Sequence, residues 1–282
     1  MIIYNGRKIR TRSIDVSPTD RALCYGDGLF ETMHWHNGRV LFLKDHMDRL
    51  LSGLRLAGIQ RPVGWSVSEI NKLIAGLVET GFKNRDARLR LQVWRKEGGL
   101  YRPSVHASNY LITASVLKAK GYVWNKKGLV VDYCPGIYLP SHPLQNSKTC
   151  NSIPYVLAGL YAEKNRLDDC LLLSIKGKLA EATGSNVFMV KDGKVITPPL
   201  SDSCIAGIMR KQVIALCKKM KVPLLERSIS TGLAAEADEL FLTNVITGIR
   251  WVARLKKRKL KNETAAYLSD ELSRSLDSFS QG

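Results

Sequence analysis

The chain has 282 residues, enough for one or two domains; 45% of its residues are hydrophobic and 24% are charged. This balance supports a buried core and excludes a disordered chain or a small disulfide scaffold. No apolar run approaches the roughly 20 residues that a membrane helix needs. The N-terminal residues show no signal-peptide pattern. We therefore expect a cytoplasmic protein with no membrane partner.

The charge is strongly basic, because 43 Lys and Arg residues against 25 Asp and Glu residues leave a net charge of +18. These basic residues are spread along the chain, and only residues 256–261 (KKRKLK) form a cluster. This distribution favours a solvated basic surface that attracts small anionic molecules over a nucleic-acid partner. The six cysteines show no CxxC spacing and no neighbouring histidines, so we expect reduced thiols and no metal.

In chain order, the first third mixes strands with two helices. Asn-Gly pairs at positions 5–6 and 37–38 are typical of tight hairpin turns. Apolar residues at helical spacing, and a capping box from Ser66 to Glu69, indicate where the helices lie. The predicted strands are 1–10, 31–35, 39–42, 87–94 and 110–117. The predicted helices are 43–58 and 66–81.

A second block of signals follows a linker predicted at residues 118–123. Its predicted strands are 129–133, 170–175, 178–182, 186–190, 194–197, 223–228 and 239–243. Its predicted helices are 152–165, 207–220 and 263–279. The pattern indicates an α+β fold with a smaller N-terminal domain over 1–117 and a larger domain over 124–282.

Three features at different places in the chain favour one kind of chemistry. Lys148 lies in a polar loop before a helix, Glu181 lies among apolar and small residues, and Gly207 precedes a helix whose first N–H groups can bind phosphate. A reactive amine, a buried carboxylate and a phosphate-binding helix end are the parts that a pyridoxal phosphate site needs. On spacing alone, a lysine at such a strand–helix junction is usually a solvated surface residue, and it is the features that follow Lys148 that favour catalysis.

Six ordered motifs strengthen this interpretation: RALCYGDGLFET, FLKDHMDRL, KTCN, EATGSNVF, TPPLSDSCIAGIMR and ADELFLTN. Together they run from about Asp20 to Val252 and resemble the class IV aminotransferases, the fold-type IV pyridoxal phosphate enzymes. That family includes branched-chain aminotransferases, D-amino acid transaminases and 4-amino-4-deoxychorismate lyases. The resemblance implies a two-domain, D-amino acid aminotransferase-like fold with the cofactor bound at the domain interface.

Carried over by motif, the resemblance implies that Lys148 is the catalytic Schiff-base lysine and that Glu181 pairs with the pyridine nitrogen. It implies that Arg49 binds the cofactor phosphate, for which its fork-shaped guanidinium is suited. Further cofactor contacts are implied for Ile208, Met209, Asn244, Val245 and Ile246. Relatives often carry a hydroxyl residue at the positions of Met209 and Val245, so these two contacts would come from the main chain.

The choice of reaction depends on the substrate pocket. The GDG-x-F-x-T pattern ends at Thr32, where the lyases have a threonine near the reacting group. The R-x-H clamp of D-amino acid transaminases is absent, and so is the tyrosine that branched-chain enzymes have shortly after the lysine. We therefore favour an aminodeoxychorismate lyase of folate biosynthesis, which releases 4-aminobenzoate and pyruvate. The alternative is a branched-chain or D-amino acid transaminase with a 2-oxo acid acceptor.

The resemblance also implies substrate contacts and a partner. Arg90 and Arg88 share one face of a predicted strand, which can be a solvated face or can hold an anionic substrate. Arg102, in the adjacent loop, and Phe30 are further substrate-binding candidates. The family implies a homodimer in which residues near Phe30 or Arg102 reach the partner's site. A remote alternative is a non-catalytic basic binding protein on the same fold.

Overall fold

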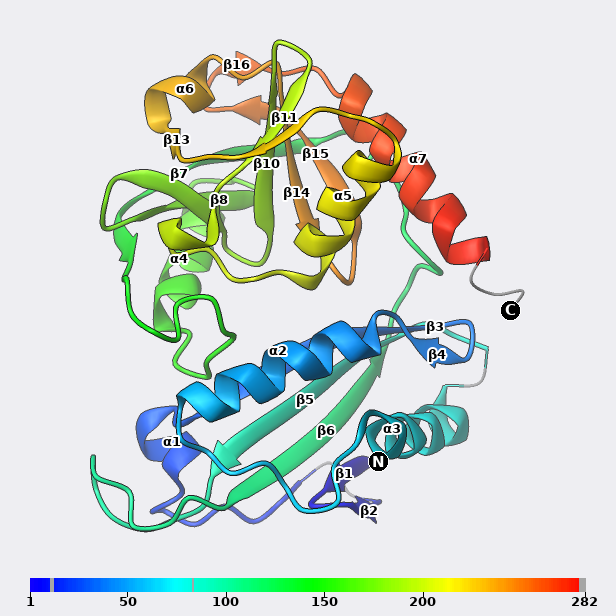
Figure 1. The fold of residues 1–282 in the computed structure, drawn as a ribbon, viewed down its shortest axis with the longest axis vertical. Coiled ribbons are helices and arrows are strands. Elements are labelled where there is room, and N and C mark those ends of the chain that lie inside the picture. The colour runs from blue at the N-terminus through cyan, green and yellow to red at the C-terminus, as the bar shows by residue number, and fades with distance from the viewer. Residues whose placement is uncertain (11–12, 83, 279–282) are drawn as a thin grey trace. The chain divides into compact units, whose positions relative to one another are not determined.

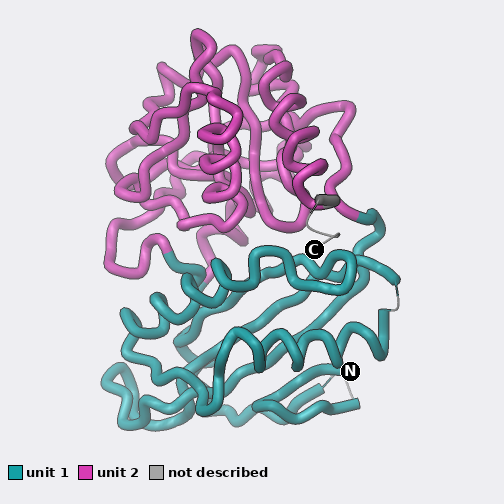
Figure 2. Tube along the Cα trace, turned by 45° about the vertical axis from the view of Figure 1, so that its right-hand side comes forward, with its two compact units in different colours: residues 1–120, 147–151 teal, residues 121–146, 152–282 magenta. Residues whose placement is uncertain are grey.

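The computed structural model describes residues 1–10, 13–82 and 84–278. It separates into two compact units (Figure 2): unit 1 is Met1–Lys120 with Ser147–Asn151, and unit 2 is Gly121–Asn146 with Ser152–Gly282. The prediction assigned every residue after 123 to the second domain, and for Ser147–Asn151 this is wrong. The Phe30 N–H donates to the Lys148 carbonyl at 2.8 Å, and the Cys150 N–H donates to the Gly28 carbonyl at 2.9 Å. These bonds join the segment to unit 1.

Unit 1 is a six-stranded sheet with helices (Figure 1), in the strand order β2-β1-β6-β5-β3-β4. Its strands are β1 (Ile2–Tyr4), β2 (Arg7–Ile9), β3 (Gly28–His36), β4 (Arg39–Val40), β5 (Ala87–Arg95) and β6 (Ser108–Val116). Its helices are α1 (Arg21–Tyr25), α2 (Leu43–Leu56) and α3 (Val67–Gly81). Side chains alternate along a strand, so one face of β5 packs with α2 and α3 in a single apolar core.

Helix ends in unit 1 follow local chemistry. The Glu69 N–H donates to the Ser66 hydroxyl at 3.1 Å, so Ser66 caps α3 as predicted. Helix α2 ends at Leu56, two residues before the predicted end. The short helix α1 was not predicted; the Asp20 carboxylate accepts from the first N–H groups of this helix.

Unit 2 is built on a sheet with the order β12-β11-β10-β14-β15-β7-β8-β9-β13. Its strands are β7 (Leu129–Leu139), β8 (Asp169–Ser174), β9 (Lys178–Ala182), β10 (Asn186–Lys191), β11 (Lys194–Thr197), β12 (Leu224–Glu226), β13 (Ile229–Ser230), β14 (Glu239–Asn244), β15 (Gly248–Leu255) and β16 (Arg258–Lys259). Its helices are α4 (Ile153–Lys164), η1 (Leu200–Asp202), α5 (Ile208–Lys219), α6 (Thr231–Ala235) and α7 (Glu263–Ser278). Strand β9 also pairs with β10, at Glu181 and Asn186. Six strands, β10-β14-β15-β7-β8-β9, therefore close into a ring at Glu181.

The structure confirms the α+β fold class and corrects details of unit 2. The strand predicted over 223–228 is only the shorter β12, the two-residue strand β13 follows it beyond the predicted end, and β7 continues six residues beyond its predicted end. Strand β15 was not predicted. The last residue of the predicted helix 263–279 lies outside the described residues. Within those residues, no helix is long and apolar enough to cross a membrane.

Candidate active site

The predicted catalytic lysine lies beside an aromatic ring in unit 1. The Lys148 Nζ atom is 4.9 Å from the centroid of the Phe30 ring. The Arg90 guanidinium carbon lies 3.8 Å from the same centroid. Thr32 follows Phe30 on the same face of β3 and is the cross-strand partner of Arg90. The structure therefore brings together Lys148, Phe30, Arg90 and Thr32, all four of which were predicted from the sequence.

A cavity of about 270 Å³ opens on this face of the sheet and is lined by Arg88, Arg90, Thr113, Ala114 and Ser115. Thr113 pairs with Arg90, and Ser115 pairs with Arg88, across β5 and β6. Burial lowers the pKa of the Arg90 guanidinium, but an arginine remains charged in proteins. Two guanidinium groups and two hydroxyls suit an anionic ligand, and carboxylates in particular.

Arg49, the predicted phosphate ligand, is held by a buried carboxylate. Its Nε atom donates to the Glu31 carboxylate at 2.8 Å, and His46 Nδ1 lies 2.6 Å from the other oxygen of Glu31. Burial would raise the pKa of Glu31, but the charge of Arg49 and the bond to His46 lower it to about 2. Burial also lowers the pKa of His46. Sequence reasoning missed Glu31, the partner of Arg49, and His46, which contacts Glu31, although both lie in the quoted motifs.

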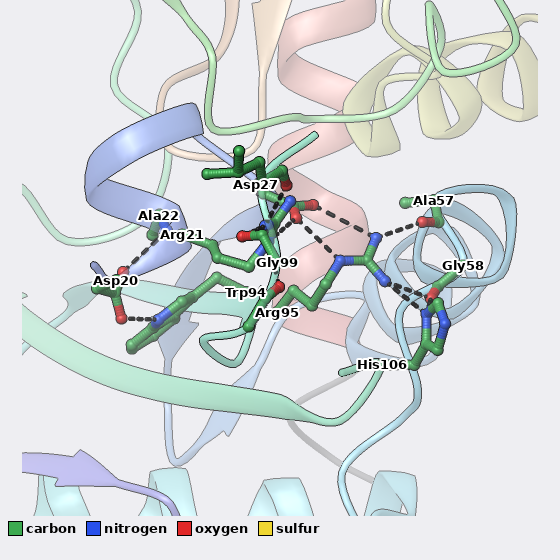
Figure 3. A network of polar contacts seen from close by, with 12 residues as sticks. Asp20, Arg21, Ala22, Asp27, Ala57, Gly58, Trp94, Arg95, Gly99 and His106 are labelled. Carbon is green, nitrogen blue, oxygen red and sulfur yellow. Dashed lines mark hydrogen bonds and ion pairs between the residues drawn. The ribbon is translucent and has the colours of Figure 1, made fainter. Parts of the chain in front are cut away.

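Arg102 lies apart from this cluster, in an exposed loop after β5. Arg21 fixes the start of that loop, because one of its nitrogens donates to the carbonyls of Gly98, Gly99 and Leu100 at 3.3, 3.1 and 2.7 Å (Figure 3). Arg21 and Arg95 also both donate to Asp27, at 2.7 and 2.9 Å. His106 Nδ1 lies 3.0 Å from Arg95, so this histidine belongs to the same network (Figure 3).

In unit 2, Glu181 is buried at the closure of the strand ring. Its carboxylate accepts from the Tyr155 hydroxyl at 2.6 Å, the Ile205 N–H at 2.9 Å and the Asn186 amide at 3.3 Å. Burial, followed by the charge of Glu181, raises the pKa of Tyr155. The hydroxyl therefore stays protonated and keeps donating. All three donors are neutral, so they support a negative carboxylate without cancelling its charge.

The predicted phosphate end of the site lies next to this carboxylate. Helix α5 begins at Ile208 after Gly207, with no side-chain cap on its first N–H groups. The Asn186 amide that donates to Glu181 also donates to the Ile205 carbonyl at 2.9 Å. A Cβ atom at Gly207 would overlap the side-chain oxygen of Asn186. Asn186 therefore links Glu181 to the start of α5, where Ile208 and Met209 lie.

The segment 244–246 lies nearby but differs from the expectation in one respect. The Asn244 amide donates to the Ser185 hydroxyl at 3.0 Å, beside Asn186 in the chain. The Ile246 N–H donates to the Asn244 side-chain oxygen at 3.0 Å. This N–H is thus engaged within the turn. The Val245 carbonyl accepts from the Tyr122 hydroxyl at 3.1 Å.

Sequence reasoning missed two residues of this cluster, Tyr155 and Asn186. Asn186 lies in the quoted EATGSNVF motif, five residues after Glu181. Tyr155 lies seven residues after Lys148, farther along the chain than the tyrosine that the resemblance to branched-chain enzymes would imply. Neither spacing identifies a partner of Glu181 without the fold, because the contact depends on how α4 packs on β7 and β8.

Comparisons with known proteins agree with this geometry. The family model described as "Amino-transferase class IV" matches residues 28–255. A putative branched-chain-amino-acid aminotransferase from Methanocaldococcus jannaschii is 30% identical, over 96% of this chain and 93% of its own length. The crystal structure of 4-amino-4-deoxychorismate lyase from Pseudomonas aeruginosa is 27% identical with a TM-score of 0.84, covering 98% of this chain and 100% of its own.

A second solved structure has the same fold at lower identity. It is an aminotransferase from Brucella abortus bound to the cofactor PLP, 22% identical with a TM-score of 0.85 over 97% of this chain and 98% of its own. The relatives thus carry both activities that the sequence left open. The match of the family model confirms the predicted family and, with it, that the chain is an enzyme. Spanning most of the chain, it shows that this protein belongs to the class IV aminotransferase family.

Proposed function

We propose that this protein is a pyridoxal phosphate enzyme that cleaves 4-amino-4-deoxychorismate to 4-aminobenzoate and pyruvate. The observation that carries the proposal is the grouping in unit 1. The amine of Lys148 and the guanidinium of Arg90 contact one aromatic ring, Phe30, and Thr32 lies beside Arg90. A reactive amine next to a half-buried arginine favours a substrate that has both an amino group and carboxylates.

The residues present fit the cofactor. Glu181 is a carboxylate supported by neutral donors, as pairing with a protonated ring nitrogen requires. The start of α5 has N–H groups without a side-chain cap, and a Cβ atom at Gly207 would overlap Asn186, which links this helix start to Glu181. In this proposal Lys148 holds the cofactor covalently, Glu181 pairs with its ring, and Ile208, Met209 and Arg49 bind its phosphate.

When bound, the cofactor withdraws electrons from the carbon that carries the substrate's amino group, so the proton on that carbon becomes acidic. Lys148 Nζ removes this proton. The C–O bond to the three-carbon side chain would then break, the ring would become aromatic, and the side chain would leave as enolpyruvate, which becomes pyruvate on taking up the proton that Lys148 removed. The Thr32 hydroxyl donates a hydrogen bond to the departing oxygen. Arg90 and Arg88 bind carboxylate groups and so fix the orientation of the ring.

A second candidate is amino acid transamination with a 2-oxo acid acceptor. The apolar Phe30 ring beside Lys148 favours it, because such a ring also suits a branched side chain. The similarity to the putative branched-chain aminotransferase from M. jannaschii also favours transamination. In this reaction Lys148 would return the proton to the cofactor instead of allowing a bond to break.

One experiment separates the two reactions. The purified enzyme is incubated with aminodeoxychorismate, and 4-aminobenzoate is followed by its fluorescence. In parallel, L-leucine, L-glutamate, D-alanine and D-glutamate are offered with 2-oxoglutarate or pyruvate. We expect 4-aminobenzoate release from wild type and none from Lys148→Ala, which also loses the absorbance of the covalent cofactor at about 400–430 nm. Efficient transamination without 4-aminobenzoate would replace the lyase by the second candidate.

We also propose a cytoplasmic homodimer. Leu100 and Tyr101 are 75% and 91% exposed at the tip of their loop, and α4 exposes Ile153, Val156, Leu157 and Leu160. Apolar groups exposed in this way on each unit suit burial against a second copy. Light scattering at micromolar concentration tests the dimer, and a fully active monomer would contradict it.

A further inference from the structure

A buried cluster of two histidines and an aspartate lies at one end of the sheet of unit 1, outside the residues used above. His34 and His36 are two positions apart on β3, so both side chains lie on the same face. Asp86 immediately precedes β5, and the pairing of Trp35 with Ala87 brings it beside His36. Neighbouring strands thus supply all three side chains.

These side chains meet at one atom. His34 Nε2 and His36 Nδ1 each lie 2.8 Å from the same carboxylate oxygen, Oδ2 of Asp86. Ligand atoms of the three residues all lie within 4.8 Å of one another. The residues are only 0%, 4% and 3% exposed, respectively. Few rearrangements are needed for one ion to touch all three.

The backbone holds this arrangement in place. The Leu41 N–H donates to the His34 carbonyl at 2.9 Å, and the Leu117 N–H donates to the Asp86 carbonyl at 2.8 Å. The ligands are therefore fixed from both sides by neighbouring strands. Such fixed placement is what a metal site needs, because a chelate on rigid strands loses little freedom when the ion binds.

Charge and donor chemistry indicate what the cluster binds. A buried carboxylate is costly unless positive charge compensates it. A shared proton or a divalent cation can supply that charge at this position. Two imidazoles and one carboxylate form a ligand set that zinc accepts, with a fourth position for water. We propose that His34, His36 and Asp86 bind a zinc-like divalent cation.

Asn37 supports the site by contacting one of the proposed ligands, His36. Its side-chain nitrogen lies 3.0 Å from His36 Nε2. Asn37, at φ 45°, is the first residue of the Asn-Gly turn in the β3–β4 hairpin, where a positive φ is required. When Nδ1 of His36 binds the ion, Nε2 carries the proton. With the Asn37 amide flipped, its oxygen then accepts a hydrogen bond from this Nε2–H group. Such partners hold the imidazole in its ligating orientation.

The surrounding charges set the strength of the site. Arg88 is the cross-strand partner of His34, and Arg39 is that of His36. Both are cations, and they oppose a bound ion. Arg88 is exposed and Arg39 is half-buried, so water screens much of this repulsion. The attraction of the three ligand atoms for the ion exceeds this repulsion, because these atoms bond the ion directly.

Calorimetric titration of the chelator-treated holoenzyme with Zn²⁺ tests the proposal, in a Cys24→Ser background that removes the exposed thiol. We expect one ion per chain, no binding by Asp86→Asn or His36→Gln, and unchanged binding by the control His142→Gln, an exposed histidine. Asn37→Ala should weaken binding about 10–100-fold. Circular dichroism establishes that each variant is folded.

Titration with Co²⁺ identifies the ligands without any variant. Visible bands of a tetrahedral site with nitrogen and oxygen ligands support the proposal, even where Asp86→Asn fails to fold. Thiolate charge-transfer bands would instead assign the ion to a cysteine and overturn it. No stoichiometric binding by wild type, or binding unchanged in folded Asp86→Asn, would also overturn it. None of these outcomes depends on the reaction proposed above.

Discussion

Each unit contains a buried glutamate beside predicted site residues, and the two glutamates are held in opposite ways. In unit 1, Glu31 bonds the charged guanidinium of Arg49 and the imidazole of His46. In unit 2, Glu181 accepts hydrogen bonds from a hydroxyl, an amide and a main-chain N–H. The charge of Glu31 is thus used within the protein, to orient Arg49. The donors to Glu181 named here are neutral and support its negative charge.

This difference indicates distinct roles for two side chains of the same type. An ion pair inside a protein is costly to break, because its remaining partner is left as a buried charge. A carboxylate supported by neutral donors can be replaced by an amide of the same shape at a smaller cost in stability. We therefore expect Glu31 to matter mainly for folding and Glu181 mainly for turnover.

The largest effect is expected from Glu181→Gln. The amide cannot stabilise a positive ring nitrogen, so kcat should fall by about 10²–10³-fold while the cofactor stays attached to Lys148. Turnover and cofactor absorbance are measured on the same samples. Glu163→Gln, an exposed change on α4, is the matched control. Wild-type turnover in Glu181→Gln would rule out the assigned role.

Glu31→Gln should instead reduce stability, and the reduction should depend on pH. The pKa of Glu31 is lowered from 4.5 to about 2 in the folded protein. Its stabilising contribution, about 3 kcal/mol, is therefore complete above pH 4.5 and is lost as the pH falls toward 2. Urea unfolding of wild type and variant at pH 7 and pH 3 measures the difference. An equal gap at both values would contradict the ion pair as its cause.

A smaller effect is expected from Gly207→Ala. The added Cβ overlaps the Asn186 side chain, so Asn186 must shift away from Glu181 and from the start of α5. We expect cofactor affinity to fall about tenfold, the equivalent of one lost hydrogen bond. Gly159→Ala, inside α4 with its nearest neighbour 4.0 Å away, is the control and should be neutral or slightly stabilising. Equal affinity in both variants would separate Gly207 from the phosphate site.

Much of the fold could be predicted because its signals are local. The Asn-Gly turns, the Ser66 cap and the alternation in β5 each depend on residues close together in the chain. Strand β15 escaped prediction because its register shifts between Val252 and Arg254, which breaks the alternation. Helix α1 is only five residues long and depends on its Asp20 cap.

The candidate site could be predicted only where a motif carries it. Lys148, Glu181 and Arg49 come from motifs, and their catalytic roles stay predictions. The partners that support them could not be found from spacing: Tyr155 is 26 residues from Glu181, and Glu31 is 18 residues from Arg49. Such pairs form only when strands and helices pack, so a single sequence holds no local signal for them.

The hydrogen bonds from Arg21 to three consecutive carbonyls restrain the loop that carries Leu100 and Tyr101, and this affects how the loop can recognise another molecule. Gly98 and Gly99 have φ values of 134° and 71°, so this stretch would sample many conformations if it were untethered. Because Arg21 has already removed that freedom on folding, a molecule that meets Leu100 or Tyr101 costs the loop little further conformational entropy. The same rigidity makes the loop selective, since it cannot reshape itself around a poorly matched surface.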